Sequence, residues 1–140
     1  MAKTKKTETK PKFISTVGRR REAVARIRLY EGKGESLVNE KPIGEYFPGE
    51  TAKLLYLAPF VTTDTVGKFY ATIRVEGGGI KGQLVALAHG LSRALALVNR
   101  EKFRPLLKKS GFLTRDARTR ERRKVGMGGK ARRKRQSPKR

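Results

Sequence analysis

The C-terminal part of the chain carries a run of like charge that no hydrophobic core could absorb. Residues 102–140 contain 17 Lys or Arg and only two acids, Asp116 and Glu121, and the closing "KARRKRQSPKR" has seven bases and no acid. From about Thr114 onward there are too few aliphatic side chains to offset the entropy lost on ordering the backbone. We therefore expect residues 114–140 to be an extended basic tail without its own core, which orders only against a partner.

The remainder of the chain has an ordinary charge balance. Residues 13–101 contain 13 basic and nine acidic side chains, whereas residues 1–12 contain five Lys and one acid. We expect a flexible basic extension over residues 1–12 and one globular body over residues 13–113. The net charge of +23 repels itself unless a polyanion neutralises it, so nucleic acid is the expected partner and an acidic membrane surface the second candidate.

Several other classes are disfavoured by what the sequence lacks. No stretch approaches the roughly 20 apolar residues of a membrane span, and "MAKTKKTETKPK" has no apolar middle of the kind found in signal peptides. The absence of Cys excludes disulfides and thiolate chemistry. We expect a protein that does not span a membrane and stays in the cytoplasm, where it is made.

Period-two alternation predicts two strands with one buried face each. In "REAVARIRLYEGKG" the apolar positions are Ala23, Ala25, Ile27 and Leu29. Arg26 and Arg28 lie between them, on a face that points either to solvent or to a phosphate backbone. In "GKFYATIRVEGGG" the apolar positions are Phe69, Ala71, Ile73 and Val75. Shorter strands are expected at residues 37–38 and near Val61.

Apolar residues three and four positions apart predict a long helix in "GQLVALAHGLSRALALVNR", in which Gly90 marks close packing. A two-turn helix is expected in "PGETAKLLYLAPF", ending before Pro59. A last short helix is expected in "RPLLKKSG", stopped by Gly111 in the left-handed conformation. The mixture of strands and helices predicts an α+β or α/β class.

Signals for catalysis or cofactor binding are weak. His89 is the sole histidine and has no carboxylate three or four residues away, so a metal or general-base role has little support. The glycines of "EGGGIKGQ" indicate either a tight turn or a backbone that approaches an RNA phosphate beside Lys81. In "TRDARTRERRK" a helical pair of Asp116 with Arg120 is possible, although folding against phosphates is the favoured interpretation. We expect no enzyme activity, cofactor, metal or small-molecule substrate.

Several stretches in fixed order resemble one known family. They are "GRRREAVARIRL", "YFPGET", "GKF", "GGGIKGQ", "HGLSRAL", "LKKSGFLTRDARTRERRK" and "KARRKRQSPKR", of which "GFLTRD" followed by "ERRK" is the most specific. The chain resembles the family of protein nine of the small ribosomal subunit, in its bacterial and organellar form. The resemblance implies a four-stranded mixed sheet packed with helices, with a left-handed βαβ crossover. It also implies a place in the head of the small subunit, in the cytoplasm or in an organelle.

The resemblance further implies partners and site residues. The expected partners are small-subunit ribosomal RNA, transfer RNA in the peptidyl site and neighbouring small-subunit proteins, and no membrane is expected among them. The residues expected to bind ribosomal RNA are Arg19, Arg20, Arg21, Lys81, Lys108, Lys109, Arg115, Arg118, Arg120, Arg122, Arg123, Lys124, Lys130, Arg132, Arg133, Lys134 and Arg135. Ser137, Lys139 and Arg140 are expected to lie nearest the transfer RNA, with Pro138 inserted where the family usually has Ser followed directly by Lys-Arg.

Two other classes remain open from the residues alone. An RNA-processing enzyme is disfavoured by the isolated histidine and the lack of a carboxylate cluster. A DNA-compacting protein would share the charge, and equal affinity for duplex DNA and ribosomal RNA would favour it.

Overall fold

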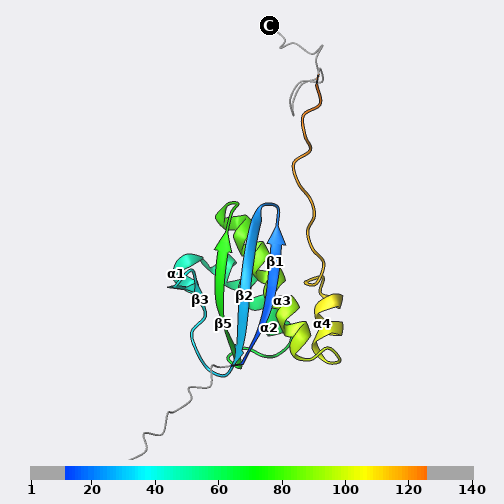
Figure 1. The fold of residues 1–140 in the computed structure, drawn as a ribbon. Helices are drawn as coiled ribbons and strands as arrows, with labels where there is room; N and C mark the ends of the chain where they lie inside the picture. Colours follow the sequence, from blue (N-terminus) through cyan, green and yellow to red (C-terminus); the bar gives the residue numbers. More distant parts are fainter. Residues whose placement is uncertain (1–11, 126–140) are drawn as a thin grey trace, which may run out of the picture.

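The computed structural model describes residues 12–125, which form one sheet covered on one face by helices (Figure 1). In chain order the elements are β1 (Phe13–Arg20), β2 (Ala23–Glu31), β3 (Leu37–Val38), β4 (Lys41–Pro42), α1 (Ile43–Tyr46), α2 (Glu50–Thr62), β5 (Phe69–Glu76), α3 (Ile80–Val98) and α4 (Phe103–Lys109). The strand order is β1-β2-β5-β3-β4. The expected α+β class is therefore confirmed.

The sheet is mixed. The pairs β1 with β2, β2 with β5 and β3 with β4 are antiparallel, whereas β3 and β5 are parallel and are joined through α1 and α2. The sheet has five strands where four were expected, because the two-residue β4 closes a hairpin with β3. The left hand of the crossover from β3 to β5 stays a prediction.

The β3–β4 hairpin ends the sheet on one side. Its two-residue loop, Asn39 and Glu40, has φ values of 48° and 69°, the left-handed conformation that tight hairpin turns need. The Asn39 side chain accepts a hydrogen bond from the Val75 amide (2.9 Å) and donates one to the Val75 carbonyl (3.1 Å). An amide side chain thus completes the hydrogen bonding of β5 where β3 has ended.

The predictions of the two longer strands, of the short strand at residues 37–38 and of the long helix are confirmed. The alternating apolar residues of β2 and β5 are buried against α3, which presents Leu84, Leu87, Leu91 and Leu95 to the sheet. Gly90 does mark close packing, since a Cβ there would meet the Ile27 side chain and the backbone of Gly18. The first strand of the sheet consequently lies almost directly on the backbone of α3.

Two predictions around α2 were wrong. The helix continues through Pro59 to Thr62, and Val61, expected in a strand, lies within it. Proline lacks an amide hydrogen and usually ends a helix. Here Pro59 and Phe60 are both buried, and this packing outweighs the missing hydrogen bond.

The start of the tail has neither helix nor strand over residues 115–124. Helix α4 is followed by Gly111 in the left-handed conformation (φ of 80°), as predicted. From there the tail runs beside β1 and continues past the end of that strand (Figure 1). None of the helices within residues 12–125 has the length and apolar character needed to cross a bilayer.

Candidate nucleic-acid interface

One face of the sheet carries no helix within residues 12–125, because α2 and α3 both lie on the other side (Figure 1). We call this surface, formed by the outward side chains of β1, β2 and β5, the open face. The strand register aligns these side chains in four rows. The rows are Phe13, Tyr30 and Tyr70; Ser15, Arg28 and Thr72; Val17, Arg26 and Arg74; and Arg19, Val24 and Glu76.

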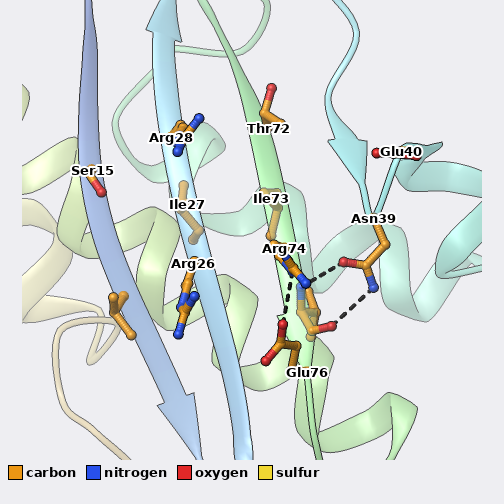
Figure 2. A pocket seen from close by; sticks show the side chains of 12 residues that line it. Ser15, Arg26, Ile27, Arg28, Asn39, Glu40, Thr72, Ile73, Arg74 and Glu76 are labelled. Atoms are coloured by element: carbon orange, nitrogen blue, oxygen red, sulfur yellow. Dashed lines mark hydrogen bonds and ion pairs between the residues drawn. The ribbon is translucent and has the colours of Figure 1, made fainter.

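The middle of the open face is a shallow hollow of about 760 Å³ with arginines along it. Figure 2 shows Arg26 and Arg28 of β2 between Ser15 of β1 and Arg74 of β5. Arg74 donates to Glu76 over 2.9 Å, and both side chains are exposed. Exposed guanidinium groups at neighbouring positions can bind successive phosphates, each in a two-pronged arrangement.

Aromatic side chains occupy one end of the open face. Tyr30 and Tyr70 stack with ring centroids 5.1 Å apart, and Phe13 lies 5.7 Å from Tyr30. The Arg28 guanidinium lies 5.2 Å from the centre of the Phe13 ring, within the range of a cation–π interaction.

The base of the tail is held against β1 by a group that we call the clasp, formed by Arg20, Asp116 and Arg118. Arg20 Nη2 lies 3.3 Å from Asp116 Oδ2, and its Nη1 donates to the Arg118 carbonyl. Arg118 grips the same carboxylate through Nε (3.0 Å) and Nη2 (2.9 Å). These Arg118 hydrogen bonds, aided by the charge of Arg20, hold the pKa of Asp116 well below its usual range. The helical pair of Asp116 with Arg120 is therefore not formed.

A second basic cluster lies where α3 crosses the edge of β1. Arg93 donates to the Val17 carbonyl, and Arg19, His89 and Arg115 line the same hollow. His89 Nε2 lies 3.4 Å from the Leu113 carbonyl, while its Nδ1 is buried with no partner among the described residues. Burial lowers the pKa of His89, and the charges of Arg93 and Arg115 lower it further. The histidine therefore packs as a neutral side chain under the start of the tail.

The glycine-rich stretch before α3 is a tight turn. Gly77 and Gly78 have φ values of 73° and 61°, and a Cβ on Gly77 would strike the Glu22 carbonyl. This favours the structural interpretation of the motif. Lys81 is exposed in the first turn of α3 and remains free to meet a phosphate.

The structure brings together only part of the predicted set of RNA-binding residues. Arg20 is 11% exposed and serves the clasp, whereas Arg19 and Arg21 are more open. Lys108 and Lys109 lie in the last turn of α4, away from the open face. Lys124 lies 3.6 Å from Glu121. Five predicted RNA-binding residues and the three transfer-RNA-facing residues lie beyond residue 125, outside the described residues, together with Pro138. They are Lys130, Arg132, Arg133, Lys134, Arg135, Ser137, Lys139 and Arg140.

Several arginines of these surfaces were absent from the predicted set. They are Arg26, Arg28, Arg74, Arg93, Arg100 and Arg104. Strand alternation could have placed Arg26, Arg28 and Arg74 on one face. Arg93 and Arg100 are seven residues apart, which is a helical repeat, but only the fold shows that they border the tail.

Neither a metal centre nor a catalytic constellation emerges from the described part of the chain. No three His, Asp or Glu side chains within residues 12–125 gather into a group that could hold a metal ion.

Comparison with known proteins points in one direction. A family model described as ribosomal protein S9/S16 matches residues 18–140. A relative from Anaeromyxobacter sp. (strain K) is 49% identical over 114 residues, which are 81% of this chain and 87% of the relative. Another, from Maridesulfovibrio salexigens, is 48% identical over 117 residues, or 84% of this chain and 89% of the relative. Both relatives are named small ribosomal subunit protein uS9, and the similarity covers body and tail together.

Proposed function

Because this chain belongs to the ribosomal protein S9/S16 family, we propose that it binds small-subunit ribosomal RNA and that its C-terminal end reaches the transfer RNA in the peptidyl site. As a member of this family it is a structural component of the small ribosomal subunit and not an enzyme. The proposal concerns what the chain contacts there and with which residues.

The clasp is the observation that carries the proposal. The tail, which has neither helix nor strand over residues 115–124, leaves the body at one fixed place, where Asp116 is held by Arg20 and Arg118. Beyond Asp116 the sequence has only one more acidic residue, Glu121, whereas basic residues continue to Arg140. A body that fixes the origin of a polycation suits binding to a polyanion that surrounds the tail.

The length of the tail supports contact with a distant partner. Residues 114–140 could span roughly 90 Å if fully extended, at about 3.3 to 3.6 Å per residue. The body can therefore lie well away from the site that Ser137, Lys139 and Arg140 reach. Arg side chains can bind phosphates bidentately and stack on exposed bases, which suits a path through folded RNA.

The remaining proposed contacts with ribosomal RNA lie on the body and along the tail. On the body we include Arg19, Arg21, Lys81, Lys108 and Lys109, to which the structure adds Arg93. On the tail we include Arg115, Arg118, Arg120, Arg122, Arg123, Lys124, Lys130, Arg132, Arg133, Lys134 and Arg135. Each neutralised phosphate adds about 0.7 to 0.9 to the slope of binding against salt concentration. We place the protein in cytoplasmic ribosomes, in the head of the small subunit and beside other small-subunit proteins.

Sedimentation of cell lysate through sucrose gradients at moderate and high salt tests the proposal. The full chain should migrate with the small subunit and resist the high-salt wash, whereas a chain that ends at residue 113 should be washed off. A full chain that stays at the top of the gradient, or that travels with chromosomal DNA, would refute RNA binding within the subunit.

A further inference from the structure

We propose that the open face binds an unpaired segment of RNA, as a second contact separate from the tail. This inference rests on the proposed function, since it assumes that RNA is the partner. It adds a surface, a class of RNA and the side chains that select it.

The charge of the open face fits a polyanion. Its four rows contain four arginines, Arg19, Arg26, Arg28 and Arg74, and one acid, Glu76. Within residues 12–125 the carboxylate of Glu76 pairs with Arg74, while Arg26 and Arg28 have no carboxylate within 4.0 Å. The covering helix α2, on the other side of the sheet, carries only Glu50 and Lys53 as charged residues. The surplus on the open face is therefore not a property of the whole body.

The spacing of the arginines suits an extended chain of phosphates. Arg26 and Arg74 lie opposite each other across β2 and β5, and Arg28 lies one row further along β2. Successive rows of a strand are about 6.7 Å apart, since each residue advances about 3.3 to 3.4 Å. A single strand laid along these rows would meet positive charge at three of them in succession, those of Arg28, of Arg26 with Arg74, and of Arg19.

The aromatic row indicates unpaired bases in preference to a duplex. Phe13, at the first position of the edge strand β1, is 44% exposed. Gly34 lies against the Tyr70 ring, where a Cβ would approach Cγ to 2.8 Å, so that ring is already covered by backbone. Tyr30 is in turn stacked on Tyr70, which leaves the exposed Phe13 ring as the stacking surface. Unpaired bases stack on such rings, whereas the bases of a duplex are already stacked on each other.

The same features disfavour a protein partner. A protein partner would bury these guanidinium groups unpaired unless it supplied carboxylates opposite them, because the face itself offers only Glu76. The apolar side chains that the described chain exposes elsewhere, such as Leu54 and Val61, lie on α2 behind the sheet.

Site-resolved cross-linking with the full chain tests the inference. The probes are a decamer of 4-thiouridine and a ten-base-pair RNA duplex that carries the same nucleotide in one strand. Irradiation followed by peptide mapping separates cross-links within residues 13–31 from cross-links in the tail. The variants are Phe13→Leu, which keeps an apolar side chain, and the double variant Arg26→Gln/Arg74→Gln. The matched control, Lys53→Gln/Lys68→Gln, removes two exposed charges that lie outside the open face.

We expect the single strand to cross-link to residues 13–31 in the parent and control chains. Phe13→Leu should lower that yield at least fivefold, because stacking on one aromatic ring contributes a five- to 150-fold gain in affinity. Arg26→Gln/Arg74→Gln should lower the salt slope of that site-specific cross-linking by about 1.4, which is about 0.7 for each phosphate contact with a single strand. Circular dichroism should show unchanged folding in every variant. The four substituted Lys and Arg side chains are exposed, and the replacement for Phe13 is also apolar.

The alternative outcomes separate this inference from the proposed function. Cross-links confined to the tail would overturn the inference and leave RNA binding by the tail standing. Equal cross-linking of duplex and single strand to residues 13–31 would overturn the choice of unpaired RNA. Absence of cross-links from both regions would count against the proposed function itself.

Discussion

Arg20 at the end of β1 and Asp116 in the tail form an ion pair of 3.3 Å between two segments almost a hundred positions apart in the chain. Arg118 completes the clasp by donating two hydrogen bonds, from Nε and Nη2, to the same carboxylate. A single acid in a strongly basic stretch thus decides where the tail leaves the body.

Replacing Asp116 by Asn should release the base of the tail. The amide keeps the size of the side chain but removes the charge that both arginines share. Because the chain has no cysteine, spin labels at Glu22→Cys and Thr119→Cys would report the distance across the clasp. We expect a broader distance distribution in Asp116→Asn and no broadening in Glu121→Gln, which removes the other tail acid. An unchanged distribution in Asp116→Asn would mean that the clasp does not position the tail.

The clasp should also survive mild acid. Arg118 and Arg20 lower the pKa of Asp116, so its contribution is fully present above the unfolded value of about 3.9 and is lost only as pH falls through the lowered folded value. The same label pair should therefore give one narrow distribution from pH 7 to pH 4. Broadening between pH 6 and pH 5 would contradict the lowered pKa.

Acid should weaken the body itself through His89. Burial lowers its folded pKa, so the unfolded chain binds more protons near the unfolded value of 6.5, and stability must rise with pH in that region. The free energy of unfolding from urea titration should fall as pH drops from 7.5 to 5.5. His89→Gln should remove most of that slope. An equal slope in both proteins would assign the effect to other groups.

Gly18→Ala should be strongly destabilising. A Cβ at residue 18 would overlap the Ala86 carbonyl and the Gly90 amide, which are backbone atoms that cannot turn aside. Overpacking in a core typically costs about 1 to 3 kcal/mol, and this site belongs at or above the upper end. Gly44→Ala is the matched control, because nothing lies within 4 Å of its added methyl group. Thermal melts that place the two variants within a degree of each other would refute the direct contact of β1 with α3.

A chain that ends at residue 113 should still fold cooperatively. The buried apolar core runs from Ala23 to Leu107, and Phe112 and Leu113, which pack against it, are retained. We expect a melting temperature within about 5 °C of the full chain, together with a much weaker salt dependence of RNA binding. A truncated chain without a cooperative transition would show that the tail belongs to the folding unit.

Deleting Lys139 and Arg140 should leave subunit assembly nearly intact and weaken transfer RNA in the peptidyl site. Exposed ion pairs contribute up to about 1 kcal/mol each, so the loss in affinity should be at most about thirtyfold. Lys5→Gln/Lys6→Gln removes two charges from the other end and serves as the control. Filter binding of transfer RNA to reconstituted subunits measures the difference. Unchanged affinity in correctly assembled subunits would remove the terminal residues from the peptidyl site.

Local periodicity was sufficient to predict the elements that have one apolar and one polar face. The buried positions of β2 and β5 and the leucine stripe of α3 follow it directly. Strand β1 escaped prediction because its inward positions beyond Ile14 are Thr16 and Gly18. Their type is set by the nearness of α3, as the hydrogen bond of 3.0 Å from Thr16 Oγ1 to the Gly90 carbonyl shows. That contact joins distant segments and leaves no local pattern.

The candidate interface was predictable to the extent that it depends on charge density. The composition of the tail was sufficient to single out its arginines, and alternation in β2 placed Arg26 and Arg28 on one face. The partners of individual side chains were not predictable. Asp116 binds Arg20 and Arg118 because residues 115–124 are not helical. Arg93 reaches the Val17 carbonyl only because α3 crosses the edge of β1.

The contact between Gly18 and Gly90 also bears on how the chain is made. The β1–β2 hairpin is complete once residue 31 has been synthesised, but the helix that covers it ends at residue 98. At about 5 to 20 residues per second, the ribosome needs roughly 3 to 13 s to supply the missing helix. During that interval the nascent hairpin exposes the apolar side of β2 and a glycine in β1 that has no partner yet. The body should therefore depend on chaperones during its own translation, and slowing synthesis between residues 31 and 98 should increase its aggregation.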